Sequence, residues 1–416
     1  MKYINRICLF FLLCIIGTVS VKAEAPEFEI SSKSVVLYQL KEDKIVYQKN
    51  KDEKLEPASL TKIMTAIVAL EKIENLDQTI TMTSSMFQGL KEENASVAGF
   101  HIGEKVTYRD LLYGVLFPSG ADATQALALS LMGSIDKFVD SMNEKAKELG
   151  MTHTHFENET GLPDDNHYSS AADIAILLKY ALKNKDFYQI LTTKTYTTTD
   201  FKIKWIPSYQ KIANRYNIKG IDYILGGKTG FTNAAGYCLA TVATYDNTEY
   251  LLVTLGSSKQ NGAVMDAKNI YEYYFEQYGY VSIVKKGEVI LKLPNLKYTK
   301  KKELTWNVSE NIDLYLEKKM DISKIKKVYQ EKTPLKYGMK KGTLLGTLSF
   351  QYEGKELAKQ EIRLEESISF DVYVFIQTNL LWILLSILLL FLIFYSYVIC
   401  HRRRLRMRKK KKLRRL

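Results

Sequence analysis

Hydrophobic residues recur at the spacing of an α-helix soon after the start of the chain. Leu60, Ile63 and Met64 share one face if residues 59–74 are helical, and Pro57 just before them is typical of a helix start. The same spacing predicts further helices over residues 108–117, 122–132, 135–149, 170–183 and 262–277.

Strand-like patterns flank these helices on both sides. Residues 34–40 and 45–47 are rich in Val, Leu, Ile and Tyr and are separated by a polar turn. Residues 237–245 and 249–255 form a second pair of this kind. We therefore expect an α+β domain over residues 24–278, with a sheet that joins its first and last strands.

The helical periodicity fades after about residue 278. Short strand-like runs then follow one another, with turns such as Lys286-Gly287 and Lys341-Gly342 between them. These runs cover residues 284–293, 304–308, 312–315, 326–329 and 346–352. They predict a separate, small, all-β domain over residues 279–370.

Both ends of the chain carry long apolar segments. Residues 1–23 combine a basic start, a short apolar core and the small residues of a cleavage site, which is typical of a signal peptide. Residues 372–400 contain no charged side chain, and we expect a transmembrane helix over residues 376–400. The basic tail 401–416 should then be cytoplasmic, with the domains outside a single-pass cell-membrane anchor that contacts lipid.

The net charge of +13, from 59 Lys and Arg against 46 Asp and Glu, lies almost entirely at the two ends of the chain. Three basic residues fall in the signal peptide and eleven in the tail, which leaves a net charge of −1 for residues 24–400. This distribution removes the main reason to expect a nucleic-acid partner. Of the four cysteines, Cys238 alone lies between the apolar ends, so we expect no disulfide within the folded domains.

Three short motifs carry the candidate chemistry. Ser59 and Lys62 are three residues apart at the start of the first helix, so the amine and the hydroxyl share one face. A desolvated lysine can become neutral enough to take the proton of such a serine. Ser119 lies in a loop 60 residues later, and the triplet Lys228-Thr229-Gly230 begins 109 residues after Ser119. The set and its order are those of penicillin-binding proteins and class A β-lactamases.

Longer blocks around these motifs resemble one branch of that group. The chain is identified as a member of the serine-type D-alanyl-D-alanine carboxypeptidases, the low-molecular-weight penicillin-binding proteins. The resemblance rests on the blocks 56–66, 103–112, 156–171 and 227–237, in that order. It implies a penicillin-binding/β-lactamase-like acyl-transferase domain, followed by a β-rich spacer domain and a membrane attachment.

The resemblance also implies a role for each candidate residue. Ser59 is expected to attack the peptide bond of a peptidoglycan stem ending in D-Ala-D-Ala, with Lys62 as the general base. Ser119 is expected to relay a proton to the leaving amine. Lys228 is expected to lower the pKa of Lys62 and, with Thr229, to hold the terminal carboxylate.

The backbone N–H groups of Ser59 and Phe231 are expected to form an oxyanion hole, and Gly230 to leave room for the substrate along the strand. β-Lactams are expected to act as covalent inhibitors. No cofactor and no metal are expected.

One position departs from the family pattern. The second motif usually reads Ser-Gly-Asn, and this chain has Ala121 in place of the asparagine. Loss of that polar contact could cost about 1–3 kcal/mol. Asp122 and Thr124 are the neighbours that could substitute for it. A catalytically weakened, membrane-anchored peptidoglycan-binding protein is therefore an alternative.

Two other enzyme classes are weaker alternatives. A β-lactamase needs a deacylating carboxylate, for which Glu157 and Glu159 are the candidates, and gains nothing from a spacer and an anchor. A zinc peptidase needs a set of ligands that His153 and His155 alone do not supply. His167 lies in one of the family blocks and is expected to order the loop near the active site.

Overall fold

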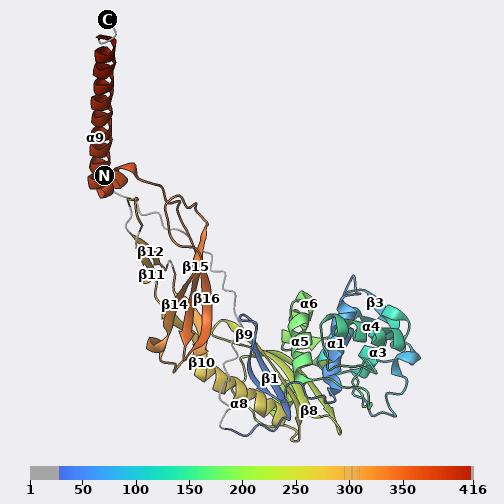
Figure 1. Ribbon diagram of the computed structural model, residues 1–416. Coiled ribbons are helices and arrows are strands. Elements are labelled where there is room, and N and C mark those ends of the chain that lie inside the picture. The colour runs from blue at the N-terminus through green and yellow to red at the C-terminus, as the bar shows by residue number, and fades with distance from the viewer. Residues whose placement is uncertain (1–27, 295, 301–302, 309, 414–416) are drawn as a thin grey trace. The chain divides into compact units, whose positions relative to one another are not determined.

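The computed structural model describes residues 28–294, 296–300, 303–308 and 310–413 (Figure 1). The predicted signal peptide, residues 1–23, lies outside this part of the chain. The described residues divide into two compact units, one ending at Tyr278 and the other beginning at Gly279.

The first unit is built around a five-stranded antiparallel sheet in the order β2-β1-β9-β8-β7. The strand β1 pairs with β9, and Val36 lies opposite Val253, so the first and last strands of the domain are neighbours as predicted. The sheet strands are β1 (Ser34–Gln39), β2 (Lys44–Lys49), β7 (Ile224–Thr232), β8 (Gly236–Tyr245) and β9 (Thr248–Ser257).

Helices cover both faces of this sheet. The helix α8 (Gly262–Gln277) packs on β8 and β9, and α5 (Ala171–Ala181) packs on β9 and β1 from the other face (Figure 1). Burial on both sides explains why β9 reads as a nearly continuous apolar run, with Leu251, Leu252 and Val253 fully buried.

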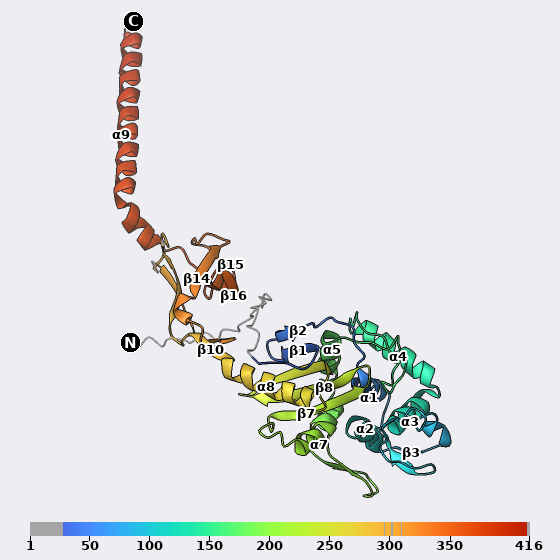
Figure 2. The same ribbon diagram turned by 90° about the horizontal axis from the view of Figure 1, so that it is seen from below.

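Most of the remaining helices form a lobe beside the sheet, where α1, α3 and α4 gather with the short strand β3 in both views, whereas α7 packs on β7 (Figure 2). The elements outside the sheet are η1 (Ala58–Leu60), α1 (Thr61–Leu70), β3 (Thr79–Thr81), η2 (Ser84–Phe87), β4 (Lys105–Thr107), α2 (Tyr108–Leu116), α3 (Ala121–Met132), α4 (Ile135–Glu148), α6 (Lys185–Thr192), β5 (Tyr196–Thr197), β6 (Lys204–Trp205) and α7 (Ser208–Arg215). The predicted helices are confirmed within a few residues, whereas α6 and α7 were not predicted.

The helix α1 is the centre of the lobe, and every one of its residues is buried. It packs against α2, α3, α4, α5 and α6. Leu60, Ile63 and Met64 are fully buried in the same cluster. This rigid environment fixes the position of Ser59 and Lys62 at the start of the helix.

The second unit contains short antiparallel strands and one long helix. Its core includes Trp306, Leu345, Phe350 and Ile362. Its elements are β10 (Tyr278–Val284), β11 (Val289–Pro294), β12 (Glu303–Asn307), β13 (Ile312–Glu317), η3 (Ile322–Lys324), β14 (Lys326–Glu331), β15 (Leu344–Tyr352), β16 (Lys355–Arg363) and α9 (Val372–Leu413). The all-β character of the spacer is confirmed.

The helix α9 is long and apolar enough to cross a membrane. The candidate span covers Val372–Arg408, and no residue of its most hydrophobic window is buried against protein. A core helix of a soluble domain would be mostly covered, so this exposure favours contact with lipid.

Candidate active site

Two serine–lysine pairs lie at the centre of the first unit. The Nζ atom of Lys62 is 3.2 Å from the Oγ atom of Ser59, and the Nζ atom of Lys228 is 2.9 Å from the Oγ atom of Ser119. These residues come from the start of α1, the loop before α3 and the strand β7. The fold therefore brings together motifs that are far apart in the sequence.

Ser59 lies in the one-turn helix η1, where the backbone is held in an unusual conformation. Ala58 has a φ of +47°, and Ser119 in the second motif has a φ of +67°. Each such non-glycine conformation costs about 1–3 kcal/mol and persists only where the surroundings enforce it. Ser59 is partly exposed, so its hydroxyl is accessible, while Lys62 behind it is buried.

The strand β7 runs close beside Ser59. A Cβ atom on Gly230 would lie 3.0 Å from the backbone nitrogen of Ser59 and 3.1 Å from the carbonyl oxygen of Pro57. Thr232 on the same strand donates a hydrogen bond to Glu56, 3.1 Å away. β7 is also the last strand of the sheet, so a peptide can add to its outer edge.

The remaining residues predicted on β7 have different environments. Lys228 is fully buried and also donates to the carbonyl of Thr229 at 2.7 Å. Thr229 is partly buried, whereas Phe231 is half exposed and stacks on Tyr237 with a centroid distance of 4.3 Å.

Burial shapes the electrostatics of both lysines. It lowers the pKa of Lys62 to about 8, against the opposing negative charges of Glu159 and Asp122. Burial, with the positive charge of Lys62 next, lowers the pKa of Lys228 well below its ordinary value. The main cause of the shift at Lys62 is thus desolvation, as the sequence suggested, and the charge of Lys228, which the resemblance implied as a cause, is not among the causes of this shift.

A loop that precedes α5 closes the site behind Lys62. The carbonyl of Thr160 accepts a hydrogen bond from Lys62 at 2.5 Å. Asn158 organises this loop, because its Oδ1 atom accepts from the backbone N–H groups of Thr160, Gly161 and Leu162. The sequence blocks include these residues but give no role to Thr160, since a backbone acceptor leaves no side-chain signal.

His167 ties the same loop to α1, as expected. Its Nε2 atom lies 2.8 Å from the hydroxyl of Thr61, and its Nδ1 atom accepts from the N–H group of Glu157. Burial lowers the pKa of His167 to about 4, so the ring is neutral near pH 7. A neutral ring that accepts at Nδ1 carries its proton on Nε2 and donates to Thr61.

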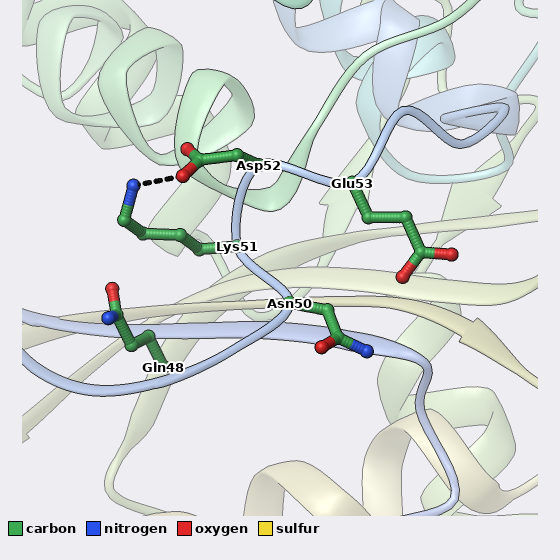
Figure 3. Close-up of a pocket in the computed structure, with 5 residues that line it drawn as sticks. All are labelled: Gln48, Asn50, Lys51, Asp52 and Glu53. Atoms are coloured by element: carbon green, nitrogen blue, oxygen red, sulfur yellow. Dashed lines mark hydrogen bonds and ion pairs between the residues drawn. The ribbon is translucent and has the colours of Figure 1, made fainter.

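A separate hollow of about 500 Å³ lies on the loop that follows β2. It is lined by Gln48, Asn50, Lys51, Asp52 and Glu53, and Figure 3 shows Lys51 paired with Asp52. None of its lining residues belongs to the two serine–lysine pairs. The hollow is therefore not the site of the chemistry described above.

Known proteins match both units of the chain. A family model described as D-alanyl-D-alanine carboxypeptidase matches residues 19–259, and one described as the C-terminal domain of penicillin-binding protein 5 matches residues 278–370. D-alanyl-D-alanine carboxypeptidase DacF of Bacillus subtilis is 33% identical over 350 residues, which are 82% of this chain and 86% of DacF. DacC of Escherichia coli is 29% identical over 353 residues, covering 83% of this chain and 86% of DacC.

Solved structures give the same result. The crystal structure of penicillin-binding protein 5 from Haemophilus influenzae is 27% identical, with a TM-score of 0.62 over 82% of this chain and 99% of the other. The DD-transpeptidase of Streptomyces K15 is 30% identical, with a TM-score of 0.55 over 61% of this chain and all of the other.

Proposed function

This chain belongs to the D-alanyl-D-alanine carboxypeptidase family, and we propose that Ser59 is the nucleophile with which it cleaves its substrate. It is a serine-type carboxypeptidase that acts on cell-wall peptides ending in D-Ala-D-Ala. The observation that carries the assignment of residues is the meeting of Ser59, Lys62, Ser119 and Lys228 in two hydrogen-bonded pairs.

In the first step, the Oγ atom of Ser59 attacks the carbonyl carbon between the two D-Ala residues. Lys62 takes the proton of the hydroxyl, which its lowered pKa of about 8 permits near neutral pH. The backbone N–H groups of Ser59 and Phe231 stabilise the oxyanion. The close approach of Gly230 to Ser59 supports this, because it brings the strand that carries Phe231 next to Ser59.

The leaving group then departs with a proton. Ser119 passes the proton to the amine nitrogen of the terminal D-Ala as the C–N bond breaks, and the hydrogen bond from Lys228 holds Ser119 for this task. Lys228 and Thr229 bind the terminal carboxylate of the substrate, which lies along the outer edge of β7. Water hydrolyses the acyl-enzyme and restores Ser59.

The location follows from α9. We propose that this helix crosses the cell membrane once, with the catalytic domain outside and the basic tail in the cytoplasm. Eleven Lys and Arg residues in the tail favour the inner face, where each contributes about 1 kcal/mol of attraction to anionic lipid when it is close to the surface.

Covalent labelling tests the assigned nucleophile. β-Lactams mimic the acyl donor, so incubation with benzylpenicillin should add one penicilloyl group, and peptide mass spectrometry should place it on Ser59. An adduct on another serine, or no adduct on a folded protein, would contradict the assignment.

A further inference from the structure

Ala121 leaves the second motif without its usual polar side chain, and the neighbouring polar residues do not replace it. The carboxylate of Asp122 accepts from the backbone N–H groups of Ala98 and Ala123, at 2.7 and 2.9 Å. The hydroxyl of Thr124 donates to the carbonyl of Ala121 at 2.8 Å. Both side chains therefore serve the local backbone.

Glu159 is a buried acid with no assigned role on the loop behind Lys62. It is 2% exposed, and its Oε1 atom has no hydrogen-bond partner within the described residues. Burying such an acceptor unpaired costs about 1–3 kcal/mol. A carboxylate in this situation needs a compensating charge nearby.

The backbone of the loop holds Glu159 beside Lys62. Its own carbonyl accepts from the hydroxyl of Thr65 at 2.6 Å, and the next carbonyl, that of Thr160, accepts from Lys62 itself. Thr65 is three residues after Lys62 and shares its face of α1. Both carbonyls of residues 159 and 160 are thus bound to this face.

The groups that act electrostatically on this pair come from several parts of the chain. Among the acidic groups, Glu159 has the largest electrostatic effect on Lys62, followed by Asp122, and both raise the pKa of the lysine. Burial and, in addition, the positive charge of Lys62 lower the pKa of Lys228 and that of His167, which lie on other elements. Burial raises the pKa of Glu159, the positive charge of Lys62 lowers it, and the negative charge of Glu93 raises it.

We propose that Glu159 is a positioning residue for acylation, and that its carboxylate stabilises the ammonium form of Lys62 in place of the side chain that is absent at Ala121. The inference rests on the proposed function of Ser59 and Lys62. The proton moves from Ser59 to Lys62 as the Oγ–C bond forms, and leaves through Ser119 as the C–N bond breaks. Glu159 acts through its charge, which burial disfavours and Lys62 favours, and exchanges no proton in the reaction.

The direction of the effect follows from the charge. In Glu159→Gln the ammonium form of Lys62 loses a stabilising negative charge, so the pKa of Lys62 falls. The rate of acylation should begin to fall at a pH lower by about half to one unit, and its plateau should fall about two- to fivefold, because the base is weaker and only part of the pKa change enters the rate.

The experiment measures the second-order rate of acylation by a fluorescent penicillin from pH 5.5 to 9.5, with the full chain in detergent. The matched control is Glu157→Gln, two residues away on the same loop, whose exposed carboxylate bonds His155. The control should leave both the pH at which the rate begins to fall and the plateau unchanged. No shift of this pH in Glu159→Gln, or an equal shift in both variants, would overturn the proposal.

A rescue variant separates positioning from mere structure. Ala121→Asn in the Glu159→Gln chain should restore most of the plateau. Ala121→Asn alone remains informative if Glu159→Gln does not fold, since it should leave the pH profile and the plateau nearly unchanged while Glu159 already stabilises the ammonium form of Lys62. If the variant that folds does not give the result stated for it, the proposal is contradicted. Slower deacylation with normal acylation would instead make Glu159 the base for hydrolysis. No acylation of the unmodified chain would contradict the proposed function itself.

Discussion

The Nζ atom of Lys228 lies 2.9 Å from the Oγ atom of Ser119, although 109 residues separate them in the chain. Lys228 has no exposed surface and Ser119 is nearly buried, at 8% exposure. The pair joins the edge strand β7 to the loop before α3. In the proposed mechanism it links the residues that bind the carboxylate to the residue that transfers the proton.

This burial predicts that one substitution affects activity far more than stability. In Lys228→Met the rate of penicillin acylation should fall by about 10- to 150-fold, as expected when a hydrogen bond to a charged group worth about 1.5–3 kcal/mol is lost. Stability should change little, because relief from the desolvation of the amine offsets the loss of its hydrogen bonds to Ser119 and Thr229. Thermal unfolding and acylation rates check both parts. A large drop in Tm with normal acylation would contradict the account.

Acylation should depend on pH through Lys62. The lysine must be neutral to accept a proton, and its pKa is lowered to about 8 by burial. The rate should therefore fall about tenfold for each pH unit below this value and level off above it. A stopped-flow pH series measures the profile. A rate that is constant from pH 6 to 9 would exclude Lys62 as the general base.

His167 should make stability depend on pH in the acidic range. Burial lowers its pKa from 6.5 to about 4, so the unfolded chain binds a proton at a pH where the folded chain does not. The contribution of His167 to the free energy of unfolding is fully present above pH 6.5. It decreases as the pH falls towards 4, by up to roughly 3 kcal/mol. Urea unfolding at pH 7.5 and 5 should show this dependence reduced in His167→Gln but retained in His101→Gln, an exposed control. An equal dependence of stability on pH in both variants would contradict this role of His167.

Two glycines beside the nucleophile should differ in their tolerance of a side chain. A Cβ atom on Gly161 would lie 2.0 Å from the carbonyl oxygen of Ala58, and φ is +78° at this position. On Gly230 its closest neighbour, the nitrogen of Ser59, is 3.0 Å away. Gly230→Ala should lower acylation while costing about 1–3 kcal/mol of stability, and Gly161→Ala should cost more. Unfolding curves compare the two, and the reverse order would contradict the geometry.

Removal of α9 should release the protein from the membrane. A chain ending at residue 370 should appear in the soluble fraction and retain D-Ala release, whereas the full chain should sediment with membranes. Fractionation by centrifugation with an activity assay measures this. A shortened chain that still sediments with membranes would show that another segment anchors it.

The sequence predicted the elements with a strong periodic pattern. The helices α1 to α5 and α8 carry apolar residues at helical spacing over at least nine residues, and each was expected within a few residues. The helices α6 and α7 have only eight residues each, too few turns to repeat a pattern. The strand β16 was missed because most of its side chains are polar.

The site was predictable where chemistry resides in side chains and motifs. The residues Ser59, Lys62, Ser119 and Lys228 were expected, and the structure brings them together. The roles of the Thr160 carbonyl and of Asn158 depend on the path of a loop, which the sequence does not specify. The engagement of Asp122 with the backbone was equally invisible, since only the fold brings Ala98 next to it.

Release of D-Ala from a peptidoglycan pentapeptide tests the central claim most directly. The full chain in detergent should release one D-Ala per pentapeptide, and Ser59→Ala should release none while keeping its Tm within a few degrees, since Ser59 is partly exposed. Undiminished release by a folded Ser59→Ala variant, or no release by the unmodified chain, would contradict the account.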